Sequence, residues 1–95
     1  MDEYIDIPDE VGGAVTFTPD PLYKPDGEEI RIDDRIVGRI RRMRSGAYTG
    51  TATISGLSVV GPLMGHRKST KADAIRLVLG QARKDLNDEA REKRR

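Results

Sequence analysis

The stretch that decides the fold is residues 36–60, which read IVGRIRRMRSGAYTGTATISGLSVV. Two turn signals, at residues 44–46 and 55–56, separate three runs in which β-favouring residues are frequent. Turn signals at this spacing, between such runs, are typical of consecutive hairpins. The stretch therefore predicts three antiparallel strands, the last of which ends by residue 63.

The pairing within these hairpins follows from the two-residue period of a strand, because alternate side chains point to opposite faces. On one face, the first hairpin pairs Ile36 with Ile54, Gly38 with Ala52, Ile40 with Gly50 and Arg42 with Tyr48. On the other face, it pairs Val37 with Thr53, Arg39 with Thr51 and Arg41 with Thr49. A two-residue turn at residues 55–56 then opposes Ile54 with Leu57, Ala52 with Val59 and Thr53 with Ser58. Both hairpins predict the same two faces, one apolar and one polar with a basic stripe.

The C-terminal part predicts a helix that begins near residue 71. Thr70 is a suitable N-cap, and Asp73 stands at the reciprocal capping-box position. Apolar residues then recur with helical spacing, at Ile75, Val78, Leu79, Ala82 and Leu86. This stripe is expected to cover the apolar sheet face, made of Ile36, Ile40, Tyr48, Ile54, Leu57 and Val59. The predicted fold class is α+β: a three-stranded antiparallel sheet on one C-terminal helix, with residues 29–33 as a fourth, edge strand.

The first 27 residues contain four of the five prolines and are predicted to form an acidic, largely irregular arm. Residues 28–95 are predicted to form the sheet and helix domain. Short runs at residues 4–7 and 15–18 alternate in the manner of strands. Residues 1–34 carry eleven acidic and two basic side chains, a net charge of −9, whereas residues 35–95 carry fifteen basic and five acidic ones, a net charge of +10. Such asymmetry is typical of proteins with a nucleic-acid or acidic-partner surface.

Composition argues against several classes of function. At 95 residues, the chain has room for one small domain. It has no cysteine, and its single histidine, His66, has no second His or Cys for a metal site. The carboxylates gather in polar, turn-rich surroundings that do not raise their pKa, and no phosphate-binding glycine loop is present. We therefore expect no catalytic site, metal or cofactor. Without an apolar run of about 20 residues, we also expect a cytoplasmic protein that does not enter a membrane.

The leading hypothesis is a small regulatory protein that binds nucleic acid, with DNA as the expected ligand. Arginine side chains can reach phosphates or guanine edges, and a sheet can enter the major groove. The predicted contacts lie on the polar sheet face and at its ends: Arg39, Arg41, Arg42, Arg44, Thr49, Thr51, Arg67, Lys68 and Lys71.

A resemblance supports this hypothesis. The segments Val37-Gly38-Arg39-Ile40, Gly46-Ala47-Tyr48 and Ser69-Thr70-Lys71-Ala72-Asp73-Ala74-Ile75 give residues 36–86 a likeness to two families of DNA-binding domain. These are the N-terminal domains of phage and transposon integrases and the plant ethylene-response factors. Their sheet reads the major groove, which by resemblance assigns the contacts to Arg39, Arg41, Thr49 and Thr51. The resemblance also implies a phage or mobile-element origin.

The same span is similar to a HicB-type antitoxin module, which implies binding to another protein instead. In this second hypothesis the chain is an inhibitor or adaptor that acts through the acidic arm or a sheet edge. The predicted partner-binding residues are Tyr4, Ile5, Ile7, Phe17, Leu77 and Gly80. The arm can also fold back on the basic face and screen it, or stay solvated. A homodimer formed through Leu77 and Gly80, or through a strand edge, is compatible with either hypothesis.

Overall fold

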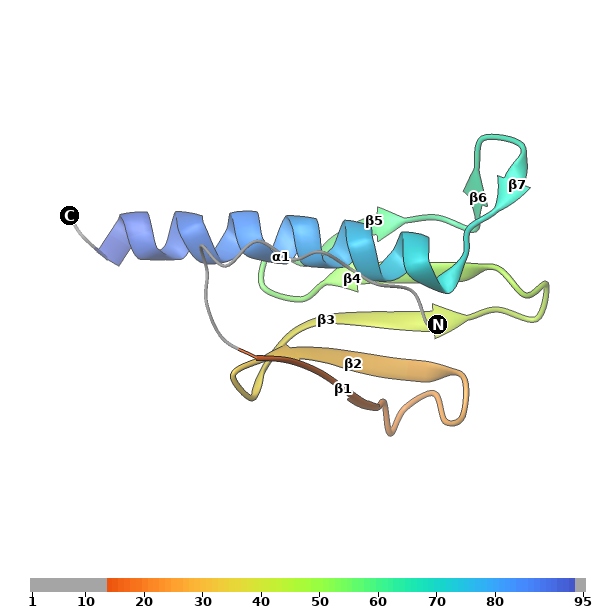
Figure 1. Cartoon of the computed structure of the whole chain (residues 1–95), viewed down its shortest axis with the longest axis horizontal. Coiled ribbons are helices and arrows are strands. Elements are labelled where there is room, and N and C mark those ends of the chain that lie inside the picture. The colour runs from red at the N-terminus through yellow and green to blue at the C-terminus, as the bar shows by residue number, and fades with distance from the viewer. Residues whose placement is uncertain (1–13, 94–95) are drawn as a thin grey trace.

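A computed structural model describes residues 14–93 and has two layers, an antiparallel sheet and one long C-terminal helix (Figure 1). The elements are β1 (Val15–Pro19), β2 (Gly27–Ile32), β3 (Arg35–Arg42), β4 (Tyr48–Ala52), β5 (Leu57–Val60), β6 (Leu63–Met64), β7 (Arg67–Lys68) and α1 (Lys71–Lys93). The α+β class is therefore as predicted.

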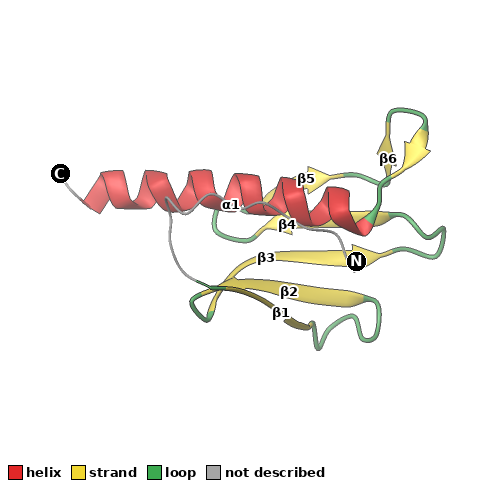
Figure 2. Ribbon diagram, in the orientation of Figure 1, coloured by secondary structure: helices red, strands yellow, loops and turns green. Residues whose placement is uncertain are grey.

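The sheet has five strands in the order β1-β2-β3-β4-β5, and β6 and β7 form a separate small hairpin (Figure 2). All neighbours in the main sheet are antiparallel. The sheet is thus larger than the three or four strands predicted. It begins at Val15, within the segment expected to form the arm, because β1 pairs with β2 along its whole length from Val15↔Ile32 to Pro19↔Glu28.

The predicted register of the first hairpin is confirmed for residues 38–42. Strands β3 and β4 pair Gly38 with Ala52, Arg39 with Thr51, Ile40 with Gly50, Arg41 with Thr49 and Arg42 with Tyr48. The turn closes through the amide of Gly46, which donates to the carbonyl of Met43 at 2.9 Å, with a φ of 92° at Gly46. Glycine has no Cβ and adopts this left-handed conformation at little cost. For this reason the glycine at position 46 predicted the turn correctly.

The placement of Val37 on the polar face was wrong. Val37 is completely buried in the core. Between Ile30 and Arg31 of β2, the partner on β3 changes from Gly38 to Ile36, so Val37 is the extra residue of a bulge. A bulge locally breaks the alternation of side chains, and here it turns Val37 toward the core.

The predicted register of β4 and β5 was also wrong. The observed pairs are Ala52↔Leu57, Thr51↔Ser58 and Gly50↔Val60, with an irregularity between Gly50 and Thr51. The turn uses residues 53–56 because the amide of Thr53 stays bonded to the carbonyl of Val37 (3.1 Å), while the amide of Gly56 donates to the carbonyl of Ala52 (2.8 Å). As a result Leu57, predicted to lie in the core, is 49% exposed, and Val60 is buried instead.

The helix covers β3, β4 and β5 with the predicted apolar stripe. Val78 lies against two glycines, since a Cβ on Gly38 or Gly50 would come within 2.1 and 2.6 Å of its methyl carbons. Helix and sheet therefore approach closely at this point. A glycine within a helix suggests close packing against the sheet or against a second chain; the sheet is not the reason at Gly80, because a Cβ there would have no neighbour within 4 Å among the described residues.

Candidate nucleic-acid interface

The sheet face opposite the helix carries a continuous row of polar side chains. The register places Thr18, Glu29, Arg39, Thr51 and Ser58 side by side across all five strands. Arg41 and Thr49 form the next row on β3 and β4. The four residues that the sequence assigned to this face, Arg39, Arg41, Thr49 and Thr51, line one hollow of about 360 Å³.

Arg39 lies beside two carboxylates, although its side chain is 42% exposed. Its Nη2 lies 3.6 Å from Glu29 Oε2, and its Nε lies 3.8 Å from Asp20 Oδ2. Asp20 is almost fully buried, and its Oδ2 and the Arg39 Nε face each other without a hydrogen bond. Two nearby acids offset the charge of Arg39, which makes it a weaker phosphate contact than its sequence position indicates.

Arg41 has an aromatic partner instead of an acidic one. Its guanidinium carbon lies 4.6 Å from the centroid of the Tyr23 ring, within the range of a cation–π contact. Tyr23 belongs to the β1–β2 loop and is 44% exposed, and the neighbouring Leu22 is 71% exposed. From the sequence, both residues were candidates for docking on another protein and were not placed beside the polar sheet face. A turn-rich segment marks a loop, but nothing in it indicates which strand the loop covers.

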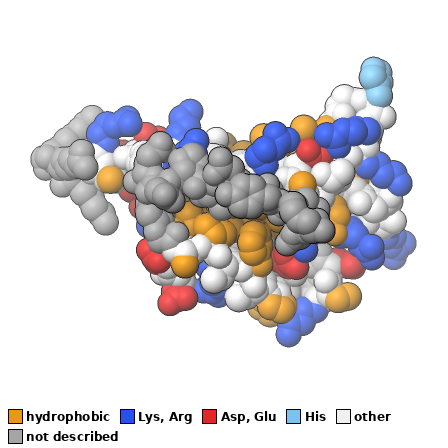
Figure 3. Space-filling view, viewed as in Figure 1, with side chains coloured by type: hydrophobic (Ala, Val, Ile, Leu, Met, Phe, Trp, Pro, Cys, Tyr) orange, Lys and Arg blue, Asp and Glu red, His pale blue; other side chains and the backbone are white. Residues whose placement is uncertain are grey.

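Several segments bring basic side chains together where β3 ends and α1 begins. We call this set the basic end: Lys24, Arg41, Arg42, Arg44, Arg67, Lys68 and Lys71. The first four line one hollow of about 630 Å³. Arg42 and Lys71 line a second one, and the Lys68 ammonium donates to the carbonyl of Ser45 beside Arg44. Figure 3 shows blue side chains along this end of the molecule.

Three members of the basic end form ion pairs. Arg42 lies 3.5 Å from Asp26, and Lys71 lies 3.1 Å from Glu28. Arg67 donates to both carboxylate oxygens of Asp73, at 2.6 and 3.2 Å.

Asp73 also accepts from the amide of Thr70 at 2.9 Å, while its own amide donates to the Thr70 hydroxyl at 3.1 Å, so the predicted capping box is confirmed. The Arg67 guanidinium and the Thr70 amide hold the pKa of Asp73 well below its ordinary value of 3.8.

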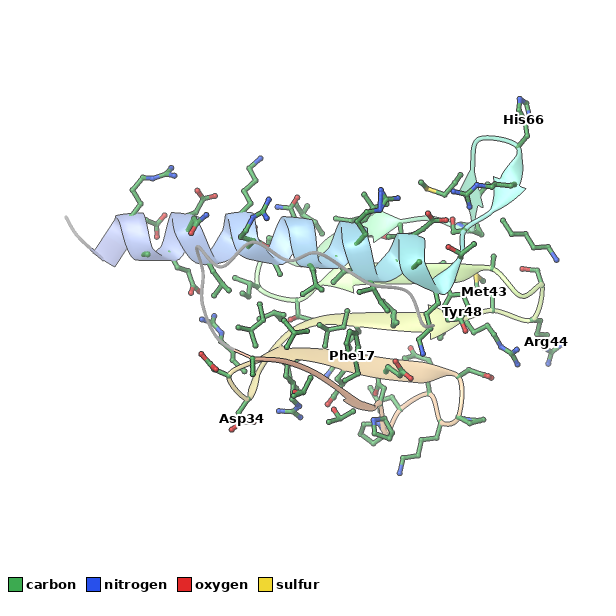
Figure 4. The ribbon with its side chains drawn as sticks, in the orientation of Figure 1. Phe17, Asp34, Met43, Arg44, Tyr48 and His66 are labelled. Atoms are coloured by element: carbon green, nitrogen blue, oxygen red, sulfur yellow. The ribbon has the colours of Figure 1, made fainter. Side chains whose placement is uncertain are left out.

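Lys24, Arg41, Arg44 and Lys68 have no acidic side chain within ion-pair distance among residues 14–93. Figure 4 shows Arg44 and Met43 in the β3–β4 loop, at the opposite end of the sheet from Asp34. The same view places His66 at the tip of the β6–β7 hairpin, which projects from the body of the molecule. The basic end therefore carries surplus positive charge, and three of these four side chains, those of Lys24, Arg44 and Lys68, are exposed.

The structure describes three of the six predicted partner-binding residues, and these three lie on two different elements, β1 and α1. Tyr4, Ile5 and Ile7 lie outside the described residues. Phe17 is 42% exposed on the helix side of β1, Leu77 packs against the core, and Gly80 is exposed on α1.

Within residues 14–93, no group of three or more His, Cys, Asp or Glu side chains is placed to hold a metal ion. Over the same range, no helix is both long enough and apolar enough to cross a membrane.

No protein-family model matches the chain, and the comparisons with curated proteins and with solved structures find no match either. The function proposed next therefore rests on the chain's own residues.

Proposed function

We propose that this protein is a small, non-enzymatic regulatory protein that binds nucleic acid through the basic end and the adjoining sheet face. The observation that carries the proposal is the gathering of unneutralised cations from separate segments: Lys24 from the β1–β2 loop, Arg44 from the β3–β4 loop and Lys68 from β7. Cations spread over one surface suit a polymer of phosphates, because each contact releases counterions from the nucleic acid.

A salt titration tests this proposal. Fluorescence anisotropy with a labelled DNA duplex should give an affinity that falls steeply with salt concentration. Replacing two of the surplus cations, in an Arg44→Ala and Lys68→Ala double variant, should reduce the slope of log affinity against log salt by about 2.

The matched control removes the same charge far from the basic end. Lys84 and Arg91 are exposed on α1, roughly 20 and 30 Å along the helix from its first residue. A Lys84→Ala and Arg91→Ala double variant should bind as the wild type does. Equal losses in both double variants, or no binding of any oligonucleotide at low salt, would contradict the proposal.

A second candidate is a protein-interaction module that acts through a sheet edge. Strand β5 is the last strand of the sheet, and Leu57 on it is 49% exposed. Unpaired edge strands are templates for strand addition by another chain. Sedimentation over a range of concentrations should then show a dimer that Leu57→Lys abolishes; a monomer at all concentrations would count against self-association by this edge.

A further inference from the structure

The β1–β2 loop turns the open sheet face into a groove. The 360 Å³ hollow has strand residues as its floor, including Arg39, Thr49 and Thr51, and loop residues Leu22 and Tyr23 as its wall. A DNA duplex docking on a sheet needs a flat or convex surface that fits the groove. Leu22 and Tyr23, which form the wall beside Arg39 and Thr51, would hinder a duplex from docking on the sheet face.

The stacked pair of Tyr23 and Arg41 forms a ridge between two hollows. Leu22, Tyr23 and Arg41 line both the 360 Å³ hollow on the sheet face and the 630 Å³ hollow at the basic end. One side of the ridge presents threonine hydroxyls, and the other presents Lys24, Arg42 and Arg44. A chain crossing the ridge would thus meet a polar pocket, an aromatic and guanidinium surface, and a cationic pocket in succession.

The loop that carries Tyr23 is closed by several hydrogen bonds of its backbone. The Asp20 carboxylate accepts from the amide of Leu22 (3.0 Å), and the Asp20 carbonyl accepts from the amide of Tyr23 (3.1 Å). The amide of Gly27 donates to the Tyr23 carbonyl at 2.8 Å. A Cβ on Gly27 would come within 2.7 Å of the Tyr23 Cβ, so the loop packs closely on the start of β2. The backbone at Tyr23 is therefore tied to Asp20 and Gly27 before any ligand binds, which lowers the entropy lost on binding.

We propose that this groove binds single-stranded nucleic acid, with a base stacked on the Tyr23 and Arg41 ridge and the adjoining phosphates held by the basic end. This inference rests on the proposed function and names its substrate class. Bases in a duplex are stacked and paired, so their faces cannot reach the ridge, whereas a single strand exposes them. Stacking tolerates any base, and the hydroxyls of Thr49 and Thr51 can bond to base edges. The groove should therefore accept single-stranded DNA and RNA with little sequence preference.

Competing oligonucleotides test the inference. Anisotropy at low salt compares a labelled 12-nucleotide oligo(dT), a labelled oligo(rU) of the same length and a 12-base-pair DNA duplex. We expect either single strand to bind at least severalfold more tightly than the duplex. If the duplex binds as tightly as both single strands, the inference fails and the proposed function stands. If none of the three binds, the proposed function fails as well.

Variants of Tyr23 test the stacking itself. Tyr23→Ala should weaken single-strand binding by roughly 5- to 100-fold and leave duplex binding nearly unchanged, while Tyr23→Phe should retain affinity because the ring remains. The control is Phe17→Ala, which removes an exposed aromatic ring from the helix side of the sheet. Thermal melts confirm that each variant is folded.

Tyrosine fluorescence shows whether Tyr23 stacks on a bound base or only supports the loop. The chain has no tryptophan, so its intrinsic fluorescence comes from tyrosine. Single-strand binding should quench a fraction of this fluorescence in the wild type, and that fraction should disappear in Tyr23→Phe. Equal quenching in both proteins, or full single-strand affinity in Tyr23→Ala, would overturn the inference.

Discussion

Gly38 and Gly50 lie in the middle of the sheet where β-branched residues would otherwise be favoured. Both face Val78, whose methyl groups occupy the space that their side chains would need. In a close-packed interior, such space cannot be shared. These two residues set how near the helix lies to β3 and β4.

Adding a methyl group here should strain the core. Gly38→Ala is expected to lower the free energy of unfolding by about 1–3 kcal/mol through overpacking, measured by urea denaturation. Gly61→Ala is the matched control, because Gly61 has open space around it and no positive φ. Val78→Ala combined with Gly38→Ala should recover part of the loss; a Gly38→Ala variant as stable as Gly61→Ala would contradict this packing.

Asp73 joins the helix N-terminus to the β6–β7 hairpin, because it binds both Thr70 and Arg67. Its pKa is lowered in the folded state, so the folded state favours the charged form. The stabilisation is therefore present above the ordinary pKa of 3.8 and is lost as the pH falls below it.

Asp73→Asn should accordingly melt at a lower temperature than the wild type at pH 7, and the difference should shrink as the pH is lowered below about 4. Circular dichroism melts over this pH range measure the effect. The control is Asp88→Asn, which removes an exposed carboxylate from the same helix and should change the melting temperature little. A difference for Asp73→Asn that stays constant with pH would rule out the carboxylate as its cause.

At the scale of elements, α1 is longer than its contact with the sheet requires. It extends from Lys71 to Lys93, and its core residues end at Ala82, with Leu86 packed at the margin. The distal half is tied to the sheet by Arg35, which donates to both carboxylate oxygens of Glu89 at 2.8 Å. The pKa of Arg35 is raised by this hydrogen bonding.

Gly80 weakens this long helix without serving a packing role in the described part of the chain. Gly80→Ala should stabilise the protein by about 1 kcal/mol, because alanine has the higher helix propensity and its Cβ meets no neighbour. Urea denaturation measures the gain. A loss of stability that depends on protein concentration would instead indicate that Gly80 lies in an interface between two copies.

For the whole molecule, the charge separation along the sequence is only partly a separation in space. Acids from the N-terminal part fold beside bases from the C-terminal part: Asp20 and Glu29 with Arg39, Asp26 with Arg42, and Glu28 with Lys71. The net charge of +10 for residues 35–95 therefore overstates the potential that a ligand would meet. Part of the surplus gathers at the basic end, where Lys24, Arg41, Arg44 and Lys68 have no acidic partner among residues 14–93.

These acids should lower the affinity for nucleic acid. An Asp26→Asn and Glu28→Gln double variant is expected to bind oligonucleotides about three- to tenfold more tightly at low salt, with a smaller gain at high salt because exposed charges are screened. Anisotropy titrations at two salt concentrations measure this. Asp88→Asn with Glu92→Gln removes two exposed acids from distant turns of α1 and should have little effect; equal gains in the two double variants would show that only net charge matters.

Local patterns in the sequence were sufficient to predict those elements that are specified by residues close together in the chain. The β3–β4 register followed from a glycine loop and a two-residue period. The start of α1 followed from the spacing of Thr70 and Asp73. The hairpin and the helix start each depend on bonds between near neighbours in the sequence. The residues that form these bonds are therefore the same ones that make the sequence pattern.

Contacts between distant segments decided the rest. The bulge at Val37 arises because β2 pairs with β3, and the β4–β5 turn shifted because Thr53 stays bonded to β3. The stacking of Tyr23 on Arg41 joins residues 18 positions apart. No short-range pattern encodes these contacts, because their energy depends on how the sheet twists and packs once all five strands are in place. The sequence therefore predicted the polar face as a surface. The groove on that face, and the acids that lie beside Arg39, follow only from the tertiary fold.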